Sequence, residues 1–295
     1  MKLLILIVVM VLERFWTTLD DMRADRAIEN QVLSIRDRLS KTLGTPLTLG
    51  LIWIAFPLLI AWFMSSLGSS LFGMLIYLLI SIAVLLLLLA PRQINQQVTA
   101  LHEACEHEDE AGAAHCRAKL AEGTSLNAET ATTQQLAERI IALGLQEWFA
   151  VLFWFVVLGP AGAVFYRFSD WLARPTSTES GGMNLPGRVQ AVLDWPVARL
   201  YAVLLLLAGG FNRGLDAWIN GGDENEASLA QKNAALVGRV GHAALELERE
   251  DDCAEGEACL ADQSRWYKNA SALVLRALLI GLGVVALFTL SGWLR

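Results

Sequence analysis

Residues 70–90 read SLFGMLIYLLISIAVLLLLLA, a stretch of 21 residues that contains no charge. A helix of about 18 or more apolar residues is long enough to cross the ~30 Å hydrocarbon core of a bilayer. Residues 47–64 and 148–166 are also free of charge, and residues 272–290 contain only Arg276. These stretches predict an all-α fold of the polytopic membrane helix-bundle class.

The composition agrees with this class. Of the 295 residues, 55% are hydrophobic and 18% are charged, whereas a soluble domain averages about 25% charged residues. None of the apolar stretches alternates in the way that the strands of a membrane β-barrel do. The net charge of −7 argues against nucleic acid as a partner, because phosphate binding requires clustered Lys and Arg. The composition therefore excludes an ordinary soluble enzyme, a barrel and a nucleic-acid-binding protein.

The apolar stretches divide the chain into regions and leave two segments that we expect to be helical and soluble. In the first of these segments we expect two helices with a turn at residues 111–113. The expected regions are N-terminal interfacial or amphipathic helices (1–46), a transmembrane hairpin (47–90), a soluble helical segment (91–147), a transmembrane helix with a polar loop at 167–190 and a second, spanning or re-entrant membrane helix (148–211), an acidic soluble helical segment (212–271) and a C-terminal transmembrane helix (272–295).

Basic residues near the ends of the spans predict the topology. If residues 191–211 cross the membrane, the polar segments 13–45, 91–147 and 212–271 share one face and hold 16 Lys and Arg residues. The positive-inside rule then places this face in the cytoplasm and favours five spans. Residues 3–12 are too few to cross, so we expect an interfacial helix there. A short, tilted sixth span and a cleaved signal peptide are the alternatives.

The four cysteines allow three interpretations. Cys105 and Cys116 lie in the first soluble segment, and Cys253 and Cys259 lie in the second. They could be unpaired thiols, or two disulfides that would place this face in the periplasm, against the basic-residue count. A metal ion held by His102, Cys105, His115 and Cys116 is the third interpretation, although their spacing matches no standard zinc pattern.

Charged residues close to the span edges are the best candidates for binding. They are Arg167, Asp170, Asp194 and Arg199. If they line one polar pocket at the membrane edge, the arginines could hold a phosphate or a carboxylate. The structural alternative for Asp194 is an N-terminal cap, with Pro196 in the first turn of a helix. The sequence contains no Walker loop and no GxGxxG, so the cofactor stays unknown.

Several motifs resemble the AmpE family, bacterial inner-membrane proteins that are encoded beside a cell-wall amidase and linked to the control of β-lactamase induction. The motifs are Val11-Leu12-Glu13-Arg14-Phe15, the segment from Phe149 to Arg167, and Asp194-Trp195-Pro196-Val197-Ala198-Arg199-Leu200. The AmpE family is in turn similar to the cobinamide-phosphate synthase family, the membrane amide synthetase of cobalamin synthesis. The resemblance implies a multi-pass inner-membrane location and adds Glu13, Arg14 and Glu138 to the candidate ligand-binding residues.

The departures from the synthetase pattern bear on function. The synthetase has Asn-Thr-Leu-Asp where this chain has Phe168-Ser169-Asp170-Trp171, and a Glu-Asn pair where this chain has Glu138-Arg139. We therefore expect a regulatory or signalling protein of the AmpE type that does not ligate cobinamide phosphate. The alternative is a membrane-bound, ATP-dependent amide ligase or transferase for an anionic or cell-wall-derived substrate. The expected partners are membrane lipid and either another membrane protein or an anionic ligand.

Overall fold

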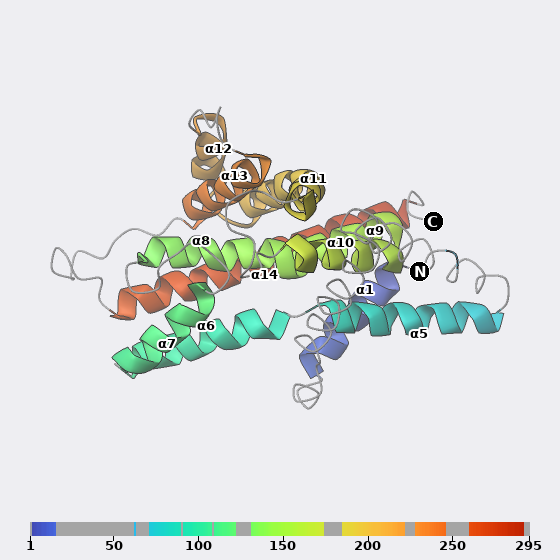
Figure 1. Ribbon diagram of the computed structural model, residues 1–295, viewed down its shortest axis with the longest axis horizontal. Coiled ribbons are helices and arrows are strands. Elements are labelled where there is room, and N and C mark those ends of the chain that lie inside the picture. The colour runs from blue at the N-terminus through green and yellow to red at the C-terminus, as the bar shows by residue number, and fades with distance from the viewer. Residues whose placement is uncertain are drawn as a thin grey trace, which may run out of the picture. The chain divides into compact units, whose positions relative to one another are not determined.

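The computed structural model describes residues 2–15, 62, 71–89, 91–107, 109–121, 131–173, 185–221, 228–245 and 260–291. Within these ranges all regular structure is helical and no strand occurs, which confirms the all-α fold. The elements are α1 (Lys2–Phe15), α5 (Leu71–Leu88), α6 (Pro91–Glu106), α7 (Glu110–Ala121), α8 (Thr133–Gly144), the π-helix η3 (Leu145–Phe149), α9 (Ala150–Leu158), α10 (Pro160–Ala173), α11 (Leu185–Ala208), α12 (Phe211–Ile219), α13 (Leu229–Ala244) and α14 (Leu260–Leu290) (Figure 1).

The chain divides into two compact units, each made from separate parts of the sequence. The first unit comprises Met1–Ala90, Ala150–Gln190 and Val285–Arg295, and the second comprises Pro91–Phe149 and Ala191–Val284. In the first unit α1 packs on α5, and α10 packs on both α5 and α9. In the second unit α6 packs on α7, and α8 packs on α13.

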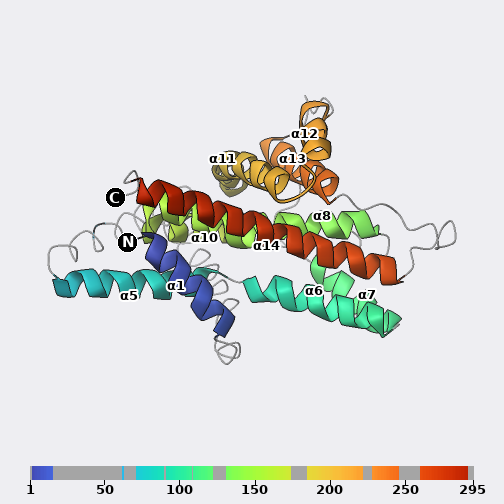
Figure 2. The same cartoon turned by 180° about the vertical axis from the view of Figure 1, so that it is seen from behind.

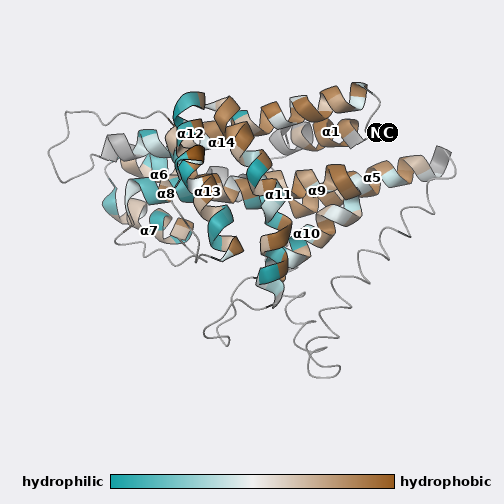
Figure 3. Cartoon of the chain, turned by 90° about the horizontal axis from the view of Figure 1, so that it is seen from above, coloured by the Kyte–Doolittle hydropathy of each residue, from teal (hydrophilic) through white to brown (hydrophobic). Residues whose placement is uncertain are grey.

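In the part of the chain that the structure describes, three helices are long and apolar enough to cross a membrane. They cover residues 133–158, 186–208 and 264–290, and a shorter apolar helix covers residues 73–88. Figure 3 shows α5 and α9 almost entirely in the brown of hydrophobic residues, and Figure 2 shows α14 as one unbroken helix. The expected span at 47–64 lies outside the described residues, apart from Trp62.

The expected continuous span at 148–166 is wrong. Helix α9 ends at Leu158 and α10 begins at Pro160. Between them Gly159 has a φ of +75°, a conformation that glycine adopts without the steric cost of a Cβ. Proline then suits the first position of the next helix, because its fixed φ is helical and its missing N–H would have no partner there. The apolar helix instead extends backwards through η3 and α8 to Thr133.

The polar loop expected at 167–190 is shorter than the sequence suggested. Residues 167–173 complete α10, and residues 185–190 form the start of α11. The reason is apolar packing, because Trp171 and Leu172 are buried and keep the end of α10 against its neighbours.

The turn expected at 111–113 does not occur there, because α6 ends at Glu106 and α7 begins at Glu110. Asp109 caps α7, because its carboxylate accepts a hydrogen bond from the backbone N–H of Gly112 at 3.0 Å. Gly112 therefore belongs to the first turn of the helix. A side chain at this position would collide with the capping carboxylate of Asp109.

Three helices of the second unit meet at Gly144. The hydroxyl of Tyr201 in α11 donates a hydrogen bond to the backbone carbonyl of Ile141 at 3.2 Å, in the last turn of α8. A Cβ added at Gly144 would lie 2.5 Å from Val274 of α14 and 2.8 Å from the Tyr201 hydroxyl. The absence of a side chain at Gly144 is therefore what allows α8, α11 and α14 to approach at this point.

We expect Gly144→Ala to lower the free energy of unfolding by about 1–3 kcal/mol, because the added methyl group overpacks the core. Gly283→Ala is the matched control, since nothing lies within 4 Å of a Cβ added at this helical position. The control should be neutral or stabilise by up to about 1 kcal/mol. Thermal unfolding in detergent, followed by circular dichroism, measures both changes. Equal midpoints for the two variants would contradict the close approach.

Candidate functional site

The strongest candidate site lies where α11 and α13 contact each other, within the second unit. Arg199 of α11 is half-buried, and its Nη1 donates to the Oδ1 of Asn233 in α13 at 3.3 Å. The same nitrogen donates to the backbone carbonyl of Trp195 at 3.0 Å. Two helices therefore hold the guanidinium in one position.

The motif from Asp194 to Arg199 lies within α11. The Arg199 Cζ lies 4.2 Å from the centre of the Trp195 ring, a distance at which a cation is attracted to the ring face. Residues four positions apart are neighbours on a helix, so the spacing of Trp195 and Arg199 sets this contact. The expectation that Asp194 caps a helix is wrong, because α11 begins at Leu185 and Asp194 lies inside it.

Asn233 is the residue that sequence reasoning missed. It is buried, with 4% of its surface exposed, and its Nδ2 donates to the backbone carbonyl of Ala191 at 2.9 Å. Pro196 lies inside α11, and a proline there cannot donate the usual hydrogen bond to the carbonyl four residues earlier. Asn233 thus bonds the α11 backbone next to the turn that proline disturbs. One feature of the sequence does mark Asn233: it is a polar residue at helical spacing from the apolar Val237 and Val240.

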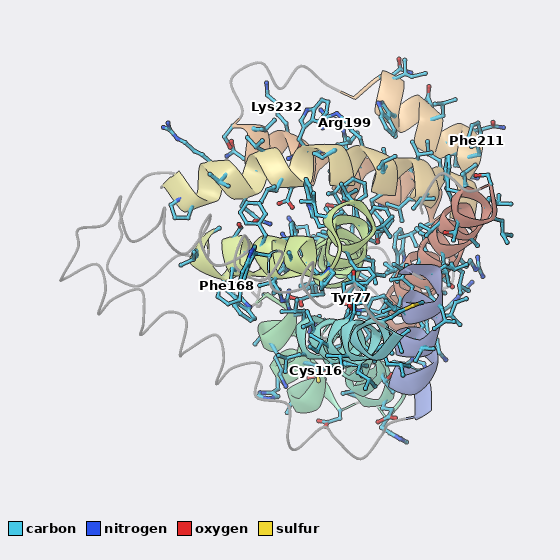
Figure 4. All side chains as sticks on the ribbon, turned by 90° about the vertical axis from the view of Figure 1, so that its right-hand side faces the viewer. Tyr77, Cys116, Phe168, Arg199, Phe211 and Lys232 are labelled. Atoms are coloured by element: carbon cyan, nitrogen blue, oxygen red, sulfur yellow. The ribbon has the colours of Figure 1, made fainter. Side chains whose placement is uncertain are left out.

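The charge of Arg199 is not balanced by a carboxylate from the described residues, because its polar contacts there are those with Trp195 and Asn233. A second basic residue, Lys232, directly precedes Asn233 in α13 and is half-buried. Figure 4 shows Arg199 and Lys232 on the same face of the α11–α13 pair. The arrangement offers fixed N–H donors and a positive potential, which suit a phosphate or carboxylate group.

Arg167 and Asp170 form a different arrangement on α10, in the first unit. Both are buried, and Arg167 Nη1 lies 3.7 Å from Asp170 Oδ2. The guanidinium also lies 5.8 Å from the centre of the Trp171 ring. Asp170 therefore supplies a counter-charge to Arg167 from the next turn of the same helix. The four-residue pocket at the membrane edge stays a prediction, since Asp194 and Arg199 belong to the second unit.

The remaining binding candidates fall at other positions. Glu138 lies on α8, where its Oε1 accepts a hydrogen bond from Gln134 at 3.0 Å. Its Oε2 would lie 3.5 Å from a Cβ built on Gly238, so Glu138 faces α13 of the same unit. Glu13 and Arg14 fall within α1, but their side chains lie outside the described part of the structure.

The cysteines of the first soluble segment are free thiols. Cys105 on α6 is buried and Cys116 on α7 is half-buried. Burial raises the pKa of both thiols, because it disfavours the thiolate, and the charges of Arg117 and Lys119 respectively oppose part of this rise. Cys253 and Cys259 lie outside the described residues. The proposed disulfide of Cys253 and Cys259 therefore stays a prediction.

The described structure gives no support to the third interpretation, a metal ion held by His102, Cys105, His115 and Cys116. Among the residues that the structure describes, no three His, Cys, Asp or Glu side chains are grouped so that they could hold a metal ion. His102 instead forms a hydrogen bond through Nδ1 with the hydroxyl of Ser264 in α14, which links α6 to that helix.

Comparison of the sequence with known proteins identifies its family. The family profile described as "Regulatory signalling modulator protein AmpE" matches residues 1–294. The chain belongs to the AmpE family. It is also similar to the cobalamin biosynthesis protein CobD of Stutzerimonas stutzeri (strain A1501), with 31% identity over 185 residues. The matched part covers 58% of each chain. No solved structure matches this chain.

Membership in this family confirms the resemblance seen in the sequence and supports a regulatory membrane protein. The Asp194-to-Arg199 motif that carried part of that resemblance now has a structural explanation. Trp195 orients Arg199 through its ring and its carbonyl, and Asn233 completes the arrangement from α13.

We expect Asn233→Ala to destabilise the protein by about 1–3 kcal/mol, because the carbonyl of Ala191 and the guanidinium of Arg199 each lose a partner. Asn212→Ala is the control, since Asn212 is an exposed asparagine of the same unit. Thermal unfolding compares the two variants. A midpoint for Asn233→Ala that equals the control would show that these two hydrogen bonds do not stabilise the fold.

We expect both described cysteines to react slowly with N-ethylmaleimide at neutral pH, because the raised pKa leaves little of the nucleophilic thiolate. The half-buried Cys116 should react before the buried Cys105, and both rates should rise with pH. Mass spectrometry without reductant measures the order. If Cys105 and Cys116 stay unmodified after denaturation and react only after reduction, they form a disulfide and the free-thiol assignment is wrong.

Proposed function

We propose that this protein is a non-catalytic regulatory protein of the bacterial inner membrane that senses an anionic ligand through Arg199. The observation that carries the proposal is the half-buried guanidinium held by Trp195 and Asn233 without a carboxylate from the described residues. A cation that is partly withdrawn from water, and has no internal counter-charge, gains more from an added anion than a fully exposed cation does.

The position of the site on two helices supports a signalling role. Asn233 contacts Arg199 with its Oδ1 and the backbone of α11 with its Nδ2. An anion that draws the guanidinium toward itself would therefore change the hydrogen bonding between α11 and α13. A bound ligand shifts a conformational equilibrium only when it binds the two conformations with different affinity. Here the two conformations would differ in whether Asn233 still bonds Arg199, so an anion at the guanidinium would favour one of them.

Several features support a regulator rather than a ligase. The sequence contains no Walker loop and no GxGxxG. The chain departs from the synthetase pattern at Phe168-Ser169-Asp170-Trp171, and the structure there pairs Asp170 with Arg167. The family description is also regulatory. By this proposal the ligand enters β-lactamase control as a signal of the state of the cell wall, not as a substrate.

We expect inorganic pyrophosphate to raise the thermal midpoint of the protein in lipid nanodiscs, because binding to the folded state stabilises it. Arg199→Gln should weaken the apparent affinity by about tenfold or more, since it removes a charge-assisted contact. Lys232→Gln should weaken it less. Lys268→Gln is the control, because Lys268 is exposed on α14, and it should bind as the native chain does.

Three results would contradict the proposal. The first is an affinity for pyrophosphate that is the same in Arg199→Gln and the native chain. The second is hydrolysis or ligation coupled to bound ATP, which would favour the ligase alternative. The third is normal β-lactamase induction in cells that carry Arg199→Gln at native protein level.

A further inference from the structure

Helix α12 is a short amphipathic helix with one face that the described structure leaves uncovered. Its packed face contains the buried Gly214, where a side chain would collide with Leu206 of α11. The opposite face is polar and includes Arg213 and Asp216, and the Asp216 carboxylate accepts a hydrogen bond from Asn220 at 2.5 Å. The helix therefore has a defined inner face and a defined polar face.

The third face of α12 is an exposed apolar stripe. Phe211, Leu215 and Ile219 are 48%, 36% and 70% exposed, and they lie four residues apart on one side of the helix. Trp218 lies beside this stripe and is half-buried. Figure 4 shows Phe211 at the outer edge of the second unit's helices. If this face of the helix lay in water, the stripe would expose apolar surface of the kind that usually marks a protein or membrane contact.

In the sequence, the stripe follows an exposed apolar surface of α11. Leu200, Val203 and Leu207 are 46%, 42% and 54% exposed, on a helix that is long and apolar enough to cross a membrane. Only Gly209 and Gly210 separate the end of α11 from Phe211. The side chains that would face lipid along the last turns of α11 are thus followed directly by those of α12.

The corner between the two helices is fixed. The backbone N–H of Gly210 donates to the carbonyl of Ala244 in α13 at 2.9 Å. Gly209 has no room for a side chain, because a Cβ there would collide with the same carbonyl and with Leu273. Helix α12 is therefore held at the end of a helix that is long and apolar enough to cross a membrane.

We propose that α12 is an interfacial helix whose stripe of Phe211, Leu215 and Ile219 inserts into the lipid surface at the end of α11. Amphipathic helices with one apolar and one polar face bind in the plane of this boundary. Trp218 suits the headgroup level, because its ring is apolar and its N–H is polar. The polar face, with Arg213, turns toward water and lipid phosphates. This surface is separate from the site at Arg199, so it does not depend on the proposed function.

The test uses nitroxide labels on the full chain in nanodiscs of phosphatidylethanolamine and phosphatidylglycerol. The four native cysteines are replaced by alanine, and single labels are attached in Leu215→Cys, Ile219→Cys and, as the polar-face control, Arg213→Cys. Electron paramagnetic resonance then compares access of oxygen, which concentrates in lipid, with access of a nickel chelate, which stays in water. We expect the oxygen-to-nickel ratio to be several-fold higher at 215 and 219 than at 213.

Two results would overturn the proposal. A nickel accessibility at 219 that equals the value at 213 would place the stripe in water. A label at 219 that is immobile and reached by neither agent would show that protein, such as a second copy of this chain, covers the stripe. Ile219 is the decisive position, because its high exposure makes a change of side chain there unlikely to disturb the fold.

Discussion

A peptide group inside a bilayer has no water to bind, so every backbone N–H and C=O of a crossing segment needs a partner from the protein. Regular helices meet this requirement by themselves. The described structure departs from regular helix at two points of its long apolar helices, the π-helix η3 and Pro196. Near both points a buried side chain adds a hydrogen bond to the backbone: Tyr201 donates to Ile141, and Asn233 donates to Ala191.

The candidate site lies beside this irregular turn of α11. Asn233 donates to the carbonyl of Ala191, the residue before Val192, whose carbonyl loses its usual helical donor at Pro196, and its Oδ1 accepts from Arg199. The two conspicuous arginines of the chain thus have different environments. Arg167 is paired with a carboxylate on its own helix, whereas Arg199 is oriented by an amide and an aromatic ring. Within the described residues, a carboxylate balances the charge of Arg167 but not that of Arg199.

The sequence predicted the all-α class and the apolar helices at 70–90 and 272–290, because charge and hydropathy are local properties. It also indicated Arg199 as a binding candidate, which stays a prediction. It failed where one residue changes the direction of the chain. Gly159 interrupts an apolar run that reads as continuous, and Asp109, rather than Gly112, sets the turn between α6 and α7. Asn233 lies 34 positions from Arg199, and periodicity alone does not indicate which helix supplies a long-range partner.

The choice of an amide at position 233 has a chemical consequence. Asparagine can donate to the carbonyl of Ala191 and accept from Arg199 at once, since its side chain carries one group of each kind. Aspartate, which differs by a single atom and arises from asparagine by spontaneous deamidation, could only accept. It would remove this hydrogen bond to the Ala191 carbonyl and place a negative charge beside the guanidinium, so slow deamidation of this one side chain would supply the counter-charge from within the protein.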